Sequence, residues 1–390
     1  MDVMACELDG PISRRGTGSL KWDAVQPGVL PMWVADMDFL SPEPVRRALA
    51  ERVQHGVFGY GIEPPELRLT IVERLERLYA WQVAPEAVVF LPGVIPGLNV
   101  ACRAYAHAGQ SALMQTPVYP GILQAPGNCG LTPRYCQLRP GLDGSYGFDK
   151  AEFEAAIAAD TAVFILCSPH NPVGRVWKRQ ELELMAEACL SHGMTIISDE
   201  IHCDLVLGGQ LHLPIAALDP DVSRRTITLM APSKTFNIAG LGCAFAVIED
   251  EEMRRRFERE KAGLVSEVNI MGFVAALAAY RQGQPWLDEV LGYLRDNRDL
   301  VLQFAQTRLH GISLPSPEGT YLAWLDCRGL AGSQPEAARD PHGFFLERAH
   351  VALSEGPAFG PGGEGHVRLN FGCPRSMLLE ALERMAGAIA

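Results

Sequence analysis

A lysine between two strand-like runs is the residue whose position most directly suggests chemistry. Lys234 follows the apolar run 226–230 and precedes a loop of small residues that leads into the apolar run 244–248. Burial in such surroundings lowers the pKa of an amine, and a neutral amine can form a Schiff base with an aldehyde. The alternative is an ordinary surface lysine in a turn, so other segments must decide between the two interpretations.

A strand-to-helix junction upstream offers a place for an anion. Directly after the predicted strand 88–91 the chain contains Gly93, Val94 and Ile95, and a helical pattern follows. Backbone N–H groups at a helix start can hold a phosphate. The neighbouring Pro92 and Pro96 lack N–H donors, which makes this signal weak when it stands alone.

Three polar residues follow or interrupt apolar strands. Asn171 lies in a proline-stiffened loop after 162–167, Asp199 follows 194–198, and Arg368 has apolar neighbours in 367–371. A buried carboxylate needs a cationic or N–H partner, and an arginine can hold a carboxylate with two parallel hydrogen bonds. The structural alternatives are a turn asparagine and an ion pair made by the arginine.

Together these residues form the set that a pyridoxal 5'-phosphate (PLP) site requires. Lys234 would hold the aldehyde, and Asp199 would keep the ring nitrogen protonated. Asn171 would donate to the phenolic oxygen, and the helix start would hold the phosphate. Arg368 would bind the carboxylate of an amino-acid substrate. The sequence therefore predicts a PLP enzyme that acts on amino acids.

The elements that must position these residues alternate between strand-like and helical patterns. The predicted strands are 88–91, 112–115, 134–138, 162–167, 194–198, 226–230 and 243–248. Such alternation indicates a mainly parallel sheet with helices on both faces. The gap 231–242 is too short for a helical crossover, so the last strand is predicted to run antiparallel. Ligands bind at the carboxyl ends of strands in these sheets, where the polar residues fall.

A second, smaller unit is predicted at the C-terminal end. A long helical pattern over about 285–310 is followed by strand-like runs at 320–326 and 367–371 and by a last helix from residue 376. The predicted division is an N-terminal arm or part of the small domain (1–45), a large PLP-binding domain (46–285) and a small domain (286–390).

Composition excludes several classes of partner. The 34 basic and 46 acidic residues give a net charge of −12, which argues against nucleic acid or an anionic membrane. We expect no membrane span, because no apolar run is long enough. We expect a cytoplasmic protein, because the N-terminus lacks the pattern of a signal peptide. The ten cysteines lack ligand-pair spacing, so we expect free thiols and no metal site.

The sequence resembles the PLP-dependent enzymes of fold type I, in the class I/II aminotransferase superfamily. Within it, the sequence is most similar to the MalY/PatB branch of cystathionine β-lyases, which are carbon–sulfur lyases. The resemblance runs nearly end to end. The motifs that carry it are SLKWD at 19–23, WVADMDF at 33–39, QTPVYP at 115–120, CSPHNPVGRVW at 167–177, SDEIH at 198–202 and SKTFNIAGL at 233–241.

The resemblance implies a fold and further site residues. The expected fold is that of aspartate aminotransferase: a large domain with a mostly parallel seven-stranded sheet, and a smaller α/β domain. Tyr119 would stack on the PLP ring, Ser233 would help to hold the phosphate, and Tyr60 would reach the phosphate of a neighbouring subunit. The last role implies a homodimer with shared active sites. The arm that contains Trp33 and Asp36 would line the substrate pocket.

Two departures from the superfamily pattern leave questions. The segment 240–243 has no arginine, which many relatives place there against the phosphate. His202 stands where many relatives have a tyrosine, and a histidine near the phenolic oxygen would alter the proton balance of the ring.

The leading hypothesis is α,β-elimination from cystathionine or a related cysteine S-conjugate to a thiol, pyruvate and ammonia. An aminotransferase is the second reading, because both reactions begin with the same carbanion. A regulatory or binding protein on this scaffold is the third.

Overall fold

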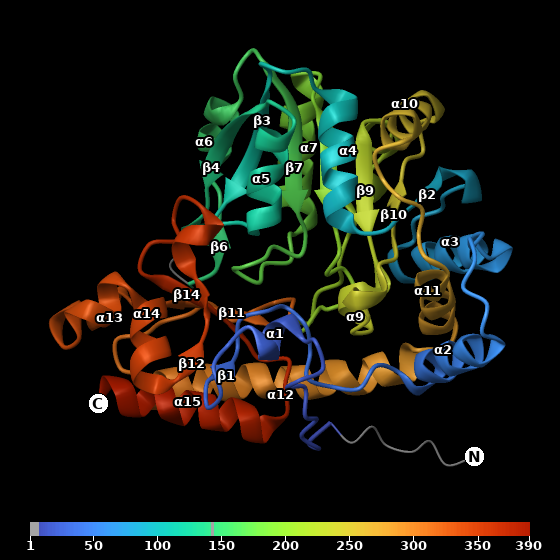
Figure 1. Ribbon diagram of the computed structural model, residues 1–390. Helices are drawn as coiled ribbons and strands as arrows, with labels where there is room; N and C mark the ends of the chain where they lie inside the picture. The colour runs from blue at the N-terminus through green and yellow to red at the C-terminus, as the bar shows by residue number, and fades with distance from the viewer. Residues whose placement is uncertain (1–7, 142–143) are drawn as a thin grey trace.

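A seven-stranded sheet forms the centre of the larger part of the molecule (Figure 1). The structure is a computed structural model that describes residues 8–141 and 144–390. The strand order is β2-β10-β9-β8-β7-β3-β4, and β10 pairs antiparallel with both of its neighbours. The strands are β2 (Val88–Leu91), β3 (Ser111–Thr116), β4 (Thr132–Gln137), β7 (Thr161–Cys167), β8 (Thr195–Asp199), β9 (Thr226–Met230) and β10 (Ala244–Val247). The other pairings are parallel, so the predicted sheet is confirmed.

Helices cover both faces of this sheet because successive side chains of a strand point to opposite faces. In β7, Val163 and Ile165 pack on the side of α4, whereas Phe164 and Leu166 pack on the side of α6 and α7. Both faces of the strand are thus apolar, as in a buried parallel sheet. The helices of this part are α3 (Pro65–Tyr79), α4 (Val94–Tyr105), α5 (Pro120–Asn128), α6 (Lys150–Ala156), α7 (Arg179–Ser191), α10 (Glu251–Lys261) and α11 (Ile270–Gln282).

The smaller part is a three-stranded antiparallel sheet that packs on long helices (Figure 1). Its strand order is β11-β14-β13, and apolar residues of α12 and α15 join its buried face in one core. The elements are α12 (Gln284–Arg308), β11 (Leu322–Asp326), β12 (Val351–Ala352), β13 (Ser354–Glu355), β14 (His366–Asn370) and α15 (Arg375–Ile389). This agrees with the predicted long helix and terminal strands, while the exact domain boundaries stay a prediction.

The N-terminal arm is tied to this smaller part. Strand β1 (Leu30–Pro31) pairs in parallel with β12, and Asn370 Nδ2 donates to the carbonyl oxygens of Val34 (2.6 Å) and Asp36 (2.7 Å). The arm begins with α1 (Leu20–Asp23) and leads into α2 (Glu43–His55), which packs on α11. The segment 1–7, which carries Cys6 and most of the N-terminus assessed for a signal peptide, lies outside the described residues. Within the described chain, no helix combines the length and apolarity that crossing a bilayer requires.

Candidate active site

A cavity of about 280 Å³ opens where five strands of the large sheet end. Its wall comes from the segments that follow β2, β3, β7, β8 and β9. Because these strand ends lie at one edge of the sheet, residues far apart in the sequence meet there. The predicted site residues that line the cavity are Gly93, Val94, Ile95, Tyr119, Asn171, Asp199, His202, Ser233 and Lys234.

Lys234 projects from α9 (Pro232–Thr235), a single turn directly after β9. Its Nζ donates to the carbonyl oxygen of Ala35 at 2.7 Å. Burial of the amine lowers the pKa of Lys234 to about 8, and the positive charge of Arg368 adds to this effect. The amine is therefore close to releasing its proton at neutral pH, which suits a nucleophile or a general base.

Asp199 ends β8 and is 4% exposed. It accepts a hydrogen bond from the backbone N–H of Ile201 (3.2 Å), and the described residues form no salt bridge with it. Burial raises the pKa of Asp199 to about 7, with the neighbouring Glu200 adding to the rise. A buried carboxylate without a salt-bridge partner is ready to receive a cationic N–H group.

The start of α4 provides the cavity with donors for an anion. Gly93 precedes α4, and the N–H groups of Val94 and Ile95 belong to the first turn, where a helix provides no acceptor. Ser233 lines the same cavity. Such a helix start also carries about half a positive charge. Among the described residues that line the cavity, Lys234 is the one Lys or Arg, so an anion here would be held without an arginine.

His202 lies in the wall as a neutral ring. Burial, followed by the charges of Lys234 and Arg368, lowers the pKa of His202 to about 3. Its Nδ1 is buried with no hydrogen-bond partner among the described residues. Its ring packs in a T-shaped contact with the ring of Tyr321, with 6.1 Å between the ring centres. The unsatisfied nitrogen suits a polar group of a bound molecule.

Tyr119 and Asn171 are linked through the backbone. Tyr119 follows β3 and its N–H donates to the carbonyl oxygen of Asn171 (3.1 Å), while its ring is 37% exposed. Burial of the hydroxyl raises the pKa of Tyr119. The side-chain Oδ1 of Asn171 accepts from Arg368 (3.0 Å), which fixes the orientation of the amide.

Arg368 lies on β14 and contacts the side chain of Asn171. Its guanidinium also donates to the carbonyl oxygen of Trp33 (2.7 Å) and to Ser354 Oγ (3.1 Å), and it lies 5.0 Å from the ring centre of Phe359. All of these partners are neutral. Burial lowers the pKa of Arg368 to about 10, and its Nε has no hydrogen-bond partner among the described residues.

Four predicted residues are not among those that line the cavity. One is Arg368, whose guanidinium contacts the lining residue Asn171. The carboxylate of Asp36 binds Arg14 (2.7 Å) and lies 3.7 Å from Lys21, and the indole of Trp33 donates to the carbonyl oxygen of Lys21 (3.1 Å). Tyr60 is fully exposed at the surface of its own chain. The pocket roles of Trp33 and Asp36 and the shared role of Tyr60 stay predictions.

Other residues of the site were not identified from the sequence. The carbonyl oxygen of Ala35 accepts from both Lys234 and the Tyr321 hydroxyl (2.9 Å). Ser354 and Phe359 surround Arg368. Tyr321 follows Thr320, whose backbone has a positive φ of +68°. A single tyrosine near the start of a strand forms no distinctive sequence pattern, so the sequence does not mark Tyr321 as a site residue.

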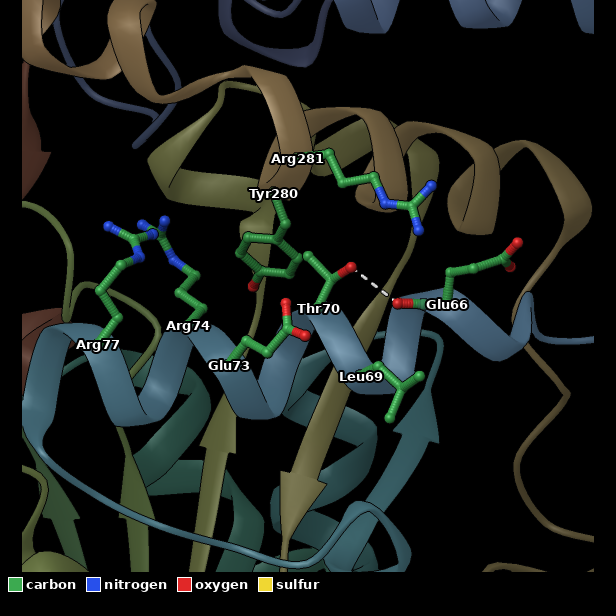
Figure 2. Close-up of a pocket in the computed structure, with 8 residues that line it drawn as sticks. All are labelled: Glu66, Leu69, Thr70, Glu73, Arg74, Arg77, Tyr280 and Arg281. Atoms are coloured by element: carbon green, nitrogen blue, oxygen red, sulfur yellow. Dashed lines mark hydrogen bonds between the residues drawn. The ribbon is translucent and has the colours of Figure 1, made fainter.

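The residue that follows Lys234 is linked to α3 through the side chain of Asp204. Asp204 accepts from Arg74 (2.8 Å), from Tyr79 (2.9 Å) and from Thr235 (2.9 Å), the residue after Lys234. Figure 2 shows Arg74 on α3, beside Tyr280 of α11, in a groove of about 320 Å³. That groove contains none of the predicted site residues, so it is a separate surface feature.

The fold and this cavity define an α/β enzyme scaffold with a partly buried lysine and a buried aspartate at one sheet edge. Residues 28–385 match the family model "Aminotransferase class I and II". The chain belongs to this family.

Individual relatives cover almost the whole chain. It is 38% identical to cystathionine beta-lyase PatB of Bacillus subtilis over 97% of this chain and 98% of the relative. The solved structure of OvoB is similar with a TM-score of 0.93 and 43% identity, covering 98% of both chains. The PLP-bound C-S lyase from Staphylococcus hominis is similar with a TM-score of 0.92 and 30% identity, again covering 98% of both chains. The expected fold is thus confirmed.

Proposed function

We propose that this chain is a PLP-dependent carbon–sulfur lyase that cleaves cystathionine or a related cysteine S-conjugate by α,β-elimination. The observation that carries the proposal is the pairing, in one cavity, of the Lys234 amine with the Asp199 carboxylate. The pKa values of both groups are shifted by burial toward neutrality. The names of PatB and of the S. hominis lyase favour carbon–sulfur cleavage over other reactions of the family.

The cavity residues fit PLP at each polar position. Asp199 has no salt-bridge partner in the described parts of the chain and would bind the pyridinium N–H, while Lys234 would hold the cofactor covalently through Nζ. Asn171 would donate to the phenolic oxygen, and Tyr119 would lie against the ring. The helix start at Val94, Ile95 and Ser233 would hold the phosphate. These assignments use every unsatisfied polar group described above except Arg368 Nε and His202 Nδ1.

When bound, PLP accepts the electron pair released at the α-carbon of an amino acid. Arg368 would orient the substrate by its carboxylate, for which the buried guanidinium has no other anionic partner. The amine of Lys234 would take the α-proton, because its lowered pKa leaves it partly neutral at neutral pH. Asp199 would keep the ring-nitrogen proton in place, because its carboxylate has no competing cation.

Elimination then follows from the chemistry of the β-carbon. The C–S bond breaks and its electron pair leaves with sulfur, which is a better leaving group than oxygen because thiols are more acidic than alcohols. The thiolate takes up a proton. Overall, the conjugate and one water yield a thiol, pyruvate and ammonia, with no net oxidation.

The test uses purified protein, PLP and cystathionine in the absence of any keto acid. We expect pyruvate and free thiol to appear in equal amounts, and Lys234→Ala to remove both products. Borohydride reduction followed by peptide mapping should place the cofactor label on Lys234. Keto-acid-dependent amine transfer without pyruvate or thiol release would favour the aminotransferase reading. A label on another lysine would contradict the assignment of Lys234.

We also infer a homodimer in which Tyr60 completes the site of the partner subunit. The segment between α2 and α3 exposes apolar side chains that no described part of its own chain covers. Val57 is 61% exposed, Phe58 59%, Tyr60 110% and Ile62 86%. A contiguous row of exposed apolar residues is typical of an interface. A tyrosine from a second copy would add a hydroxyl donor at a phosphate site that has no arginine.

A cytoplasmic location is part of the same proposal. The nine described cysteines are free, and eight of them are buried. Free thiols in this number suit a reducing compartment.

A further inference from the structure

Helices α4 and α5 lie side by side, and both begin at the cavity. Val94 and Ile95 form the first turn of α4, and Tyr119 precedes α5. The two starts are in close contact, since a Cβ added to Gly121 would lie 2.5 Å from Ile95 Cδ1. The position of one helix start therefore limits the position of the other.

At their far ends, the same two helices bring two thiols together. Cys102 lies in the last turns of α4, and Cys129 directly follows α5. The two thiols are neighbours, and each shifts the pKa of the other. Two hydrogen bonds hold Cys129 against the turn of α4 that precedes Cys102: Cys129 Sγ donates to the Asn99 carbonyl oxygen (3.5 Å), and Asn128 Nδ2 donates to Asn99 Oδ1 (2.9 Å).

The two thiols differ in access and in acidity. Cys102 is fully buried, whereas Cys129 is half-buried and can be reached by a small reagent. The interaction with the Cys102 side chain lowers the pKa of Cys129 to about 7, and the positive charge of Arg103 acts in the same direction. By contrast, burial raises the pKa of Cys136 and of Cys243. The accessible thiol of the pair is thus also the more nucleophilic one at neutral pH.

We propose that Cys102 and Cys129 form a redox-active dithiol that low-molecular-weight disulfides convert to an intramolecular disulfide. The Cys129 thiolate attacks one sulfur of the reagent, so the reagent's S–S bond breaks and one thiolate leaves. Cys102 then attacks the Cys129 sulfur of the mixed disulfide, loses its proton and releases the second thiolate. Two cysteine thiols are oxidised, one disulfide is reduced to two thiols, and the protons of the cysteines go to the released thiolates.

The bond would join α4 and α5 at the ends opposite the cavity. In the reduced protein the far ends are held by hydrogen bonds, whereas the oxidised protein would hold them covalently. Since the near ends carry Ile95 and Tyr119, the modification would restrict both sides of the cavity together. The proposal does not depend on the reaction that the cavity catalyses.

The test treats the full-length protein with bis(2-hydroxyethyl) disulfide, then quenches with acid and measures the intact mass. We expect the loss of two hydrogens and, in a non-reducing peptide map, a cross-link between the peptides of Cys102 and Cys129. Cys102→Ser should stop at the mixed disulfide on Cys129, and Cys129→Ser should give neither product. Cys243→Ser is the matched control and should behave like the wild type.

The interaction between the two thiols has its own readout. Cys102→Ala removes the polar group beside Cys129, whereas Cys102→Ser retains a hydroxyl in its place. Restoring an ordinary thiol pKa should slow the mixed-disulfide step at pH 7 by about three-fold in Cys102→Ala relative to Cys102→Ser. If the wild type keeps its mass while free cysteine in the same tube is oxidised, or if the reagent attaches to a different cysteine, the proposal is wrong.

Discussion

Arg368 allows a sharp test of the site because the unliganded protein leaves its charge unbalanced. The side chain is 5% exposed and donates to Asn171, to the Trp33 carbonyl oxygen and to Ser354, all of which are neutral. The described residues provide no carboxylate for it, and its Nε has no partner. A substrate carboxylate would supply the missing charge.

The magnitude follows from the burial of the guanidinium. Burial lowers the pKa of Arg368 to about 10. This lowering corresponds to a cost of about 3 kcal/mol for keeping the buried group charged. A bound carboxylate would offset most of this cost, and hydrogen bonds to charged groups are worth about 1.5–3 kcal/mol each. We therefore expect Arg368→Gln to lose about 3–4 kcal/mol of transition-state stabilisation, which lowers kcat/KM on the order of 10²- to 10³-fold.

The assay compares steady-state kcat/KM for cystathionine in the wild type, Arg368→Gln and Arg368→Lys. The lysine variant should fall between the other two, because it keeps the charge but loses the two-pronged geometry. An S-alkyl 3-thiopropionate, which has the carboxylate but no amino group, should inhibit the wild type and lose affinity for Arg368→Gln. Arg328→Gln is the control, since Arg328 is an exposed arginine paired with Asp326.

Two results would refute this reasoning about Arg368. One is a kcat/KM for Arg368→Gln within a few-fold of the wild type, in protein with an unchanged thermal midpoint. The other is equal binding of the thiopropionate to both proteins. Either would mean that the substrate carboxylate binds elsewhere.

Three further predictions address other parts of the site. Asp199→Asn keeps the shape but removes the charge, so kcat should fall by roughly ten- to a hundred-fold with little change in KM; unchanged turnover in cofactor-loaded protein would contradict its role. The pKa of Lys234 is lowered to about 8, so above pH 8 the unfolded chain binds a proton that the folded chain does not. Urea unfolding of cofactor-free protein should thus show a free energy of unfolding that rises between about pH 8 and 10, by up to about 3 kcal/mol relative to Lys234→Met; equal slopes would argue against a buried amine. Mixing Tyr60→Phe with Lys234→Ala should restore up to roughly one quarter of wild-type activity by random pairing of subunits, provided that each variant alone is inactive; an active monomer in sedimentation would exclude the shared site.

The fold could be predicted because local sequence patterns indicate its strands and the connections between them. Strands β2, β3, β8, β9 and β10 are buried along their whole length, whereas the edge strand β4 is mostly exposed. The antiparallel direction of β10 follows from the short connection after β9. Asp199, Asn171 and Lys234 could be selected because parallel strands end at one edge, so polar residues at those ends meet.

The surroundings of Arg368 could not be predicted in the same way. Phe359 lies in the glycine- and proline-rich stretch 356–363, which has no periodic pattern, and Ser354 precedes it. The structure shows β13 and a short 3-10 turn, with Phe359 only 2% exposed against the guanidinium. Such contacts depend on how β13 pairs with β14, which no local pattern records.

The arm shows a different limit, because it acts through its backbone. The sequence draws attention to the side chains of Trp33 and Asp36, yet it is the carbonyl oxygens of Trp33 and Ala35 that contact Arg368 and Lys234. The side chain of Asn237, three residues after Lys234, bonds the arm in turn through the N–H (3.0 Å) and the carbonyl oxygen (2.8 Å) of Met37. Any residue can provide a carbonyl oxygen, so residue type does not reveal this function. What the side chains of Trp33 and Asp36 contribute is position: both bind groups of the segment 14–21, and this holds the two carbonyl oxygens in place.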